Sequence, residues 1–147
     1  KVCDPYLVDL EAKMEAGGDR PKSGVELYRW QGETMHELPA LVIVAIEGRF
    51  ESEPVGMQAA KYGMVLPVAW SFMLALRARG LGSCWTTLHL YEEAAVAKAL
   101  GMPDNVTQTV LLPVAYYTGD DFRPAKRPPA DNFIHWNRWG DHTSPAG

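Results

Sequence analysis

The feature that most constrains this chain is an apolar segment at positions 58–79. Val65, Val68, Phe72 and Leu76 recur in it at spacings of three and four residues, which is typical of a helix. Alanine and methionine side chains widen this stripe until little of the circumference is polar. A helix that is apolar all round is normally enclosed by other structure. The sequence therefore predicts a long, buried central helix.

The composition favours one soluble globular domain. The chain has 147 residues, of which 47% are hydrophobic and 22% are charged, and its formal net charge is −4. The acidic balance and the scattered Lys and Arg residues argue against nucleic acid as a partner. The longest uncharged run, residues 62–76, is shorter than the roughly 18 to 20 apolar residues of a membrane span, so we also expect no membrane partner. Cys3 and Cys84 show no CxxC spacing and no signal peptide is recognised, which predicts a cytoplasmic protein.

The expected elements alternate in type along the chain. A continuous β-branched run at 41–46 predicts a central strand that is covered on both faces. Periodicity leaves residues 25–30 open between helix and strand. The other expected elements are helices at 6–16, 58–79 and 91–100 and strands at 83–90 and 107–117. This order indicates an α+β fold with a sheet of few strands.

We expect a single domain, residues 1–147, with an extended tail at 119–147. Pro124, Pro128 and Pro129 stiffen the tail, and an aromatic segment at 133–139 makes it too apolar to remain free. Two alternatives stay open for this segment. It packs on its own domain, or it crosses to a second copy in a symmetric dimer.

Most of the residues that could act in catalysis or bind a metal are better explained by a structural role. The histidines lack the short spacings of metal ligands, so we predict no metal site. Cys84 is a lone cysteine in an apolar segment, where packing is a more common role than nucleophilic attack. Glu92 and Glu93 are adjacent and point to different helix faces, which is typical of charge in a first helical turn.

Two features allow a functional interpretation. The junction at 80–88 turns sharply from the long helix into the next segment, so main-chain N–H groups and the hydroxyls of Thr86 and Thr87 could face a ligand. In residues 123–129, prolines brace the adjacent cations Lys126 and Arg127, an arrangement that suits a phosphate. The alternatives are an ordinary turn and a solvated basic loop.

Several segments in this order resemble the C-terminal portion of the FMN-dependent nitroreductase family. They are Ala75-Leu-Arg-Ala-Arg-Gly-Leu-Gly-Ser-Cys-Trp-Thr-Thr87, Val96-Ala-Lys-Ala-Leu-Gly-Met-Pro-Asp104, Leu111-Leu-Pro-Val-Ala-Tyr116, Pro124-Ala-Lys-Arg-Pro128 and the closing His135-Trp136 with Trp139. The resemblance covers about residues 38–140. Residues 1–37 lack the arginine-rich and Ser-Gly-Asn-type motifs with which the family opens, so we expect the family's usual N-terminal segment to be missing.

The resemblance implies an intertwined homodimer that holds FMN at the subunit interface. NAD(P)H would reduce the flavin, which would pass electrons to a small-molecule acceptor such as a nitroaromatic or a quinone. It implies no catalytic side chain, because the flavin carries the hydride. By position, the flavin ring would be bordered by Trp85, Thr86, Thr87 and Leu88, and the phosphate would be held by Lys126 and Arg127. The alternative function is a non-catalytic dimeric module that binds or sequesters the flavin.

Overall fold

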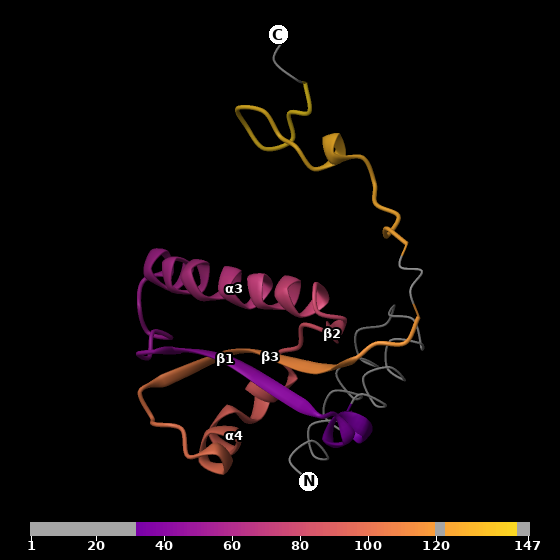
Figure 1. Ribbon diagram of the computed structural model, residues 1–147. Helices are drawn as coiled ribbons and strands as arrows, with labels where there is room; N and C mark the ends of the chain where they lie inside the picture. Colours follow the sequence, from indigo (N-terminus) through magenta and orange to yellow (C-terminus); the bar gives the residue numbers. More distant parts are fainter. Residues whose placement is uncertain (1–31, 120–122, 144–147) are drawn as a thin grey trace. The chain divides into compact units, whose positions relative to one another are not determined.

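The fold is organised around β3 (Val106–Tyr116), which pairs antiparallel with β1 (Ala40–Glu47) along one edge and with β2 (Leu81–Ser83) along the other (Figure 1). The computed structural model describes residues 32–119 and 123–143. They belong to two units, Lys1–Tyr117 and Thr118–Gly147, and each unit is considered by itself. The strands predicted at 41–46 and 107–117 are confirmed. The central position, however, belongs to β3 and not to β1, because β3 has partners on both edges.

Two α-helices flank this sheet. Helix α3 (Val55–Arg77) lies over one face and α4 (Glu93–Leu100) lies on the opposite side (Figure 1). Short 3-10 helices complete the described elements: η1 (Met35–Glu37), η2 (Leu88–Glu92) and η3 (Ala130–Asn132). Both predicted helices are present, with α4 beginning at Glu93 because η2 precedes it. The predicted strand at 83–90 is wrong beyond Ser83, apart from one bridge at Thr86. The expected elements at 6–16 and 25–30 lie outside the described residues.

The core forms where α3 crosses β3. Ala69, Val110 and Leu112 are each 0% exposed and pack together. A methyl side chain at Ala69 lets the helix approach the strand closely, so the larger side chains of β3 fill the space between them. Met73 and the β1 residues Val42 and Val44 complete this cluster.

A bulge in β3 adjusts its pairing with β1. Val44 pairs with Val110, but Ala45 pairs with Gln108, so Thr109 is the extra residue. The Thr109 hydroxyl donates a hydrogen bond to the Val44 carbonyl at 2.7 Å, which satisfies a polar group in a residue that is only 4% exposed. The bulge thus shifts the register of the strand without leaving the threonine hydroxyl unpaired.

Pro113 explains why β2 is short. Pairing of β3 with the chain at 81–86 keeps one register, since Ser83 faces Val114 and Thr86 faces Leu111. Leu111 donates its N–H to Thr86 on this edge, and every second residue of a strand points to the same edge, so the N–H of residue 113 would also point there. Proline has no N–H to donate. Regular pairing therefore stops after Ser83 and resumes only at Thr86.

Helix α3 is less enclosed than the sequence predicts. Only Val65, Ala69 and Leu76 are buried in it, because the described residues of the first unit place the sheet on one face of the helix. Large apolar side chains on the rest of the helix are exposed, among them Val68 at 61% and Trp70 at 59%. Among the described residues α3 is also the one helix that is long and apolar enough to cross a membrane, a test based only on length and composition.

We predict that Leu112→Ala lowers the free energy of unfolding by about 2–5 kcal/mol, because it opens a cavity where the surrounding atoms cannot collapse. Urea denaturation followed by circular dichroism measures this change. Leu100→Ala is the matched control, since Leu100 is 61% exposed, and should cost less than about 1 kcal/mol. Equal losses in the two variants would contradict the assignment of the core.

Candidate functional site

The segment that follows β2 is attached to β3 at its beginning. Thr86 and Leu111 exchange two main-chain hydrogen bonds, with N···O distances of 3.1 and 2.9 Å. Thr86 is 6% exposed, and its side-chain oxygen accepts a hydrogen bond from the Leu88 N–H at 3.3 Å. The Leu90 N–H donates to the Thr87 carbonyl at 3.0 Å, which starts the tight turn of η2. The conformation of residues 86–90 is therefore fixed by local hydrogen bonds and by the sheet.

The same segment is attached to β3 a second time, at Glu93. Arg49 donates two parallel hydrogen bonds to the Glu93 carboxylate, at 2.8 and 2.9 Å, and a third to the Val106 carbonyl at 2.9 Å. The Gln108 N–H donates to the same carboxylate at 3.1 Å, and the Gln108 side-chain amide donates to the Glu93 carbonyl at 2.9 Å. A paired, charge-assisted geometry of this kind is stronger than a single contact. Glu51 also forms an ion pair with Arg49.

Two buried polar groups accompany this anchor. Both ring nitrogens of His89 and the Gln108 side-chain oxygen are enclosed and have no hydrogen-bond partner among the described residues. Burial lowers the pKa of His89 below its ordinary value of 6.5, although the nearby Glu93 carboxylate opposes the shift. The hydrogen bonds from Arg49 lower the pKa of Glu93 below its ordinary value of 4.5. His89 is thus neutral and Glu93 ionised near pH 7.

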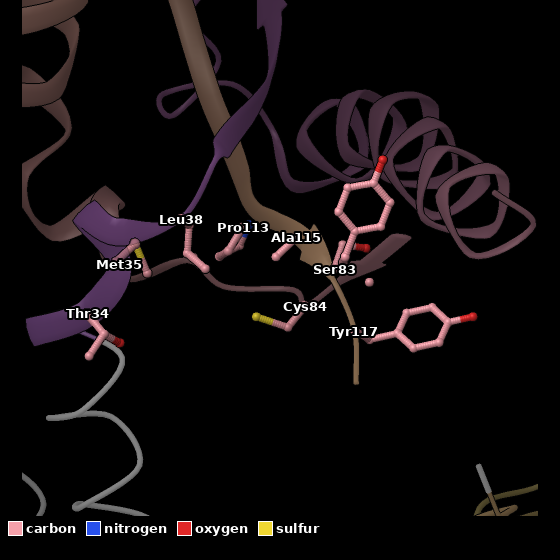
Figure 2. Close-up of a pocket in the computed structure, with 10 residues that line it drawn as sticks. Thr34, Met35, Leu38, Ser83, Cys84, Pro113, Ala115 and Tyr117 are labelled. Carbon is pink, nitrogen blue, oxygen red and sulfur yellow. The ribbon is translucent and has the colours of Figure 1, made fainter. Parts of the chain in front are cut away.

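A pocket of about 240 Å³ lies beside the gap that Pro113 creates (Figure 2). Its lining is largely apolar. In Figure 2 the exposed side chain of Cys84 points toward the side of the pocket formed by Thr34, Met35 and Leu38. The other lining residues are Gly82, Ser83, Pro113, Ala115, Tyr116 and Tyr117.

The structure brings four of the predicted site residues together directly after this pocket. Trp85 is 40% exposed and Thr87 is also exposed, whereas Thr86 is buried and Leu88 is half-buried. The Thr86 N–H is bonded to Leu111, so it does not face a ligand. The N–H groups of Trp85 and Thr87 have no partner within the described part of the chain. The ligand-facing groups of this segment are therefore those of residues 85 and 87.

The other two predicted residues belong to the second unit. Lys126 and Arg127 are exposed, and neither forms an ion pair with another described residue. Pro124, Pro128 and Pro129 flank them, and η3 follows directly. The structure describes this unit separately, so it does not test whether these cations meet residues 85–88. In the aromatic segment, His135 stacks on Trp139 with ring centres 4.2 Å apart.

Sequence reasoning missed the anchor at Glu93. The adjacent residues Glu92 and Glu93 indicated only charge in a first helical turn, and the sequence predicted no role for Arg49. One signal was present in the sequence, because Thr107, Gln108 and Thr109 are polar residues in an otherwise apolar strand. All three are buried, at 3–4% exposure, and each donates a side-chain hydrogen bond.

Among the described residues, no group of three or more His, Cys, Asp or Glu side chains could hold a metal ion.

The fold resembles that of solved structures. One similar solved structure is a BluB-like flavoprotein from Clostridium difficile 630, with a TM-score of 0.54 and 16% sequence identity over 93% of this chain and 72% of that chain. The likeness at this identity concerns the fold. No curated protein matches the sequence.

The family is shown by the sequence itself. Residues 6–116 match the family model described as Nitroreductase family. The chain belongs to the nitroreductase family, which associates it with a flavin oxidoreductase type of fold.

The range of this match corrects the predicted one. The resemblance was expected at about residues 38–140 and only with the C-terminal portion of the family, but the match begins at residue 6 and ends at residue 116. Residues 85–88 fall inside it. Lys126 and Arg127 fall beyond it, so their role stays a prediction from chemistry.

We predict that the free energy of unfolding decreases as the pH falls below about 6.5, the ordinary pKa of histidine. His89 has a lowered pKa in the folded chain, so the unfolded chain binds a proton that the folded chain resists. This contribution is complete above pH 6.5 and is lost toward lower pH. Urea denaturation between pH 5 and pH 8 measures it.

His89→Leu should flatten this dependence, and His36→Leu, at an exposed position, should leave it unchanged. A slope that persists in His89→Leu would assign the pH dependence to other groups.

Proposed function

We propose that this protein is an FMN-dependent NAD(P)H oxidoreductase of the nitroreductase type. The observation that carries the proposal is the segment 85–88, which lies within the family match and is fixed to β3 on both sides. A segment held in this way presents N–H groups in a fixed geometry, which is what a protein supplies to a flavin ring. The acceptor would be a nitroaromatic, a quinone or a related small molecule.

The residues present suit the chemistry of FMN. A flavin ring is flat, apolar on its faces and edged with hydrogen-bond acceptors. It would meet the exposed indole of Trp85 and the N–H groups of residues 85 and 87, which have no partner among the described residues. A phosphate needs fixed cations, and Lys126 and Arg127 are exposed cations braced by prolines. When bound, FMN would take a hydride from NAD(P)H and deliver electrons to the acceptor.

The chain itself would bind and orient rather than transfer protons. Thr86 and Leu88 would hold the segment in place, since Thr86 is buried and bonded to Leu111. Trp85 and Thr87 would contact the ring, and Arg127 would hold the phosphate bidentately. We propose no catalytic side chain. We propose the cytoplasm as the location, because the chain has only two cysteines and they show no CxxC spacing.

We further propose that a second copy of the chain covers α3. The exposed side of the helix is apolar and carries no charged residue between Tyr62 and Leu76. Two such faces related by a twofold axis are self-complementary, because apolar groups meet apolar groups and no charge is buried. An apolar face of this kind, exposed on a monomer, would promote association between copies of the chain. The dimer would provide the enclosure that the sequence predicts for this helix.

We predict that the purified chain binds FMN and turns yellow, and that the complex oxidises NADPH in the presence of a quinone or nitroaromatic.

Arg127→Ala should weaken FMN binding about tenfold or more, because a charge-assisted hydrogen bond contributes about 1.5–3 kcal/mol. Fluorescence titration of FMN measures the affinity. A chain that stays colourless after FMN is added would contradict the proposal. A yellow protein without NADPH oxidation would favour the flavin-sequestering alternative.

We predict that Val68→Asp converts the dimer into monomers, because it places a charge in the apolar face of α3. Sedimentation velocity measures the oligomeric state. Leu100→Asp is the matched control, since both residues are 61% exposed and Leu100 lies on α4. A wild-type chain that is monomeric, or that partitions into detergent or vesicles instead of dimerising, would overturn the assignment of α3 to a dimer.

A further inference from the structure

We propose that Glu93 is a positioning residue for the flavin, acting through η2 on segment 85–88, in which Trp85 and Thr87 would contact the ring. This inference rests on the proposed function and adds to it a residue that touches neither the flavin nor the acceptor. It arises from the ion pair and hydrogen bonds that join Arg49, Glu93 and Gln108, which we call the Glu93 clamp.

The clamp and the Thr86 bridge hold the two ends of one short segment to the same strand. Thr86 is bonded to Leu111 at one end, and Glu93 is bonded to Gln108 at the other. On β3 these two attachment points are only three positions apart, whereas Thr86 and Glu93 are seven positions apart along their own segment. The segment must therefore fold back on itself, which it does as η2. The separation of its ends is set by a rigid, buried strand.

Only one of these two attachments can be changed by altering a side chain. The Thr86 bridge consists of main-chain hydrogen bonds and survives most substitutions. The Glu93 end depends on a carboxylate that accepts from Arg49 and from the Gln108 N–H together. Gln108 is 3% exposed, and its side-chain amide donates a hydrogen bond to the Glu93 carbonyl at 2.9 Å. The position of Gln108 against Glu93 is therefore fixed. The conformation of η2 thus depends on the charge of a residue five positions beyond Leu88.

The neighbouring carboxylate has no such part. Glu92 is exposed and none of the hydrogen bonds of the clamp involve it. The two glutamates are adjacent and chemically identical, so they form a matched pair for substitution. A general effect of negative charge at the start of α4 would act through both, whereas the clamp acts through Glu93 alone.

The substitution Glu93→Gln keeps the size and one acceptor oxygen but places an amide donor where Arg49 also donates. We expect amide hydrogen exchange of residues 85–90 to speed up about threefold to tenfold in the flavin-free protein, since the pair is partly exposed. Residues 81–83 should keep their exchange rates. Arg49→Lys, which retains the charge but loses the paired geometry, should have an effect of the same direction. Glu92→Gln should match the wild type.

The flavin measurement separates positioning from a purely structural role. With FMN bound, Glu93→Gln should shift the visible absorption bands of the flavin and weaken its affinity about threefold to tenfold, whereas Glu92→Gln should change neither. A folded Glu93→Gln protein with unchanged exchange at 85–90 would overturn the clamp. Faster exchange with an unaltered flavin spectrum and affinity would reduce the clamp to a structural contact and overturn the positioning role. A wild type that binds no FMN would overturn the proposed function, and the exchange result would still decide the clamp.

Discussion

The hydrogen-bonding capacity of β3 is the constraint on which the rest of the first unit depends. A central strand has two edges to satisfy, and in β3 both are used. One edge pairs with β1, and the other pairs with β2 and then with Thr86. The first residue of α4 is also bonded to this strand, through Gln108. Because Val110 and Leu112 are fully buried under α3, the strand cannot move without disrupting the core. Residues 86–93 of the candidate site are therefore held against one rigid strand.

Pro113 shows how one residue can limit an edge without weakening the sheet. A proline in a central strand normally costs a ladder hydrogen bond. Here the missing donor faces β2, so the long ladder with β1 stays complete. The cost falls at Cys84, where regular pairing is interrupted and the pocket of about 240 Å³ opens. The same interruption separates the chain from the sheet at residues 84 and 85, and in the segment that follows Trp85 and Thr87 are exposed for contact with a ligand.

The sequence predicts the elements better than their arrangement. Local patterns define α3, β1 and β3 closely, because a helical stripe and a β-branched run depend on neighbouring residues. Patterns also place the junction at 80–88 among the candidate functional segments. They do not reveal η2, whose turn depends on bonds to Thr86 and Thr87, or the Glu93 clamp, which joins residues 44 positions apart at Arg49 and Glu93. Such pairings depend on strand register and on the Thr109 bulge. Neither of these is encoded in the spacing of apolar residues.

Residues that do not suit the element in which they lie mark the places where a neighbouring element meets it. Gln108 is a polar side chain in a buried strand, and it holds the start of α4. Pro113 is a proline in a central strand, and it ends the pairing of β2. Helix α3 is apolar on faces that its own chain leaves exposed, which argues for a second copy there. Sequences are generally consistent across levels of structure, so local conflicts are most informative where a neighbouring element resolves them. For Gln108 and Pro113 that neighbour lies within the chain, and for α3 we propose that it is a second copy of the chain.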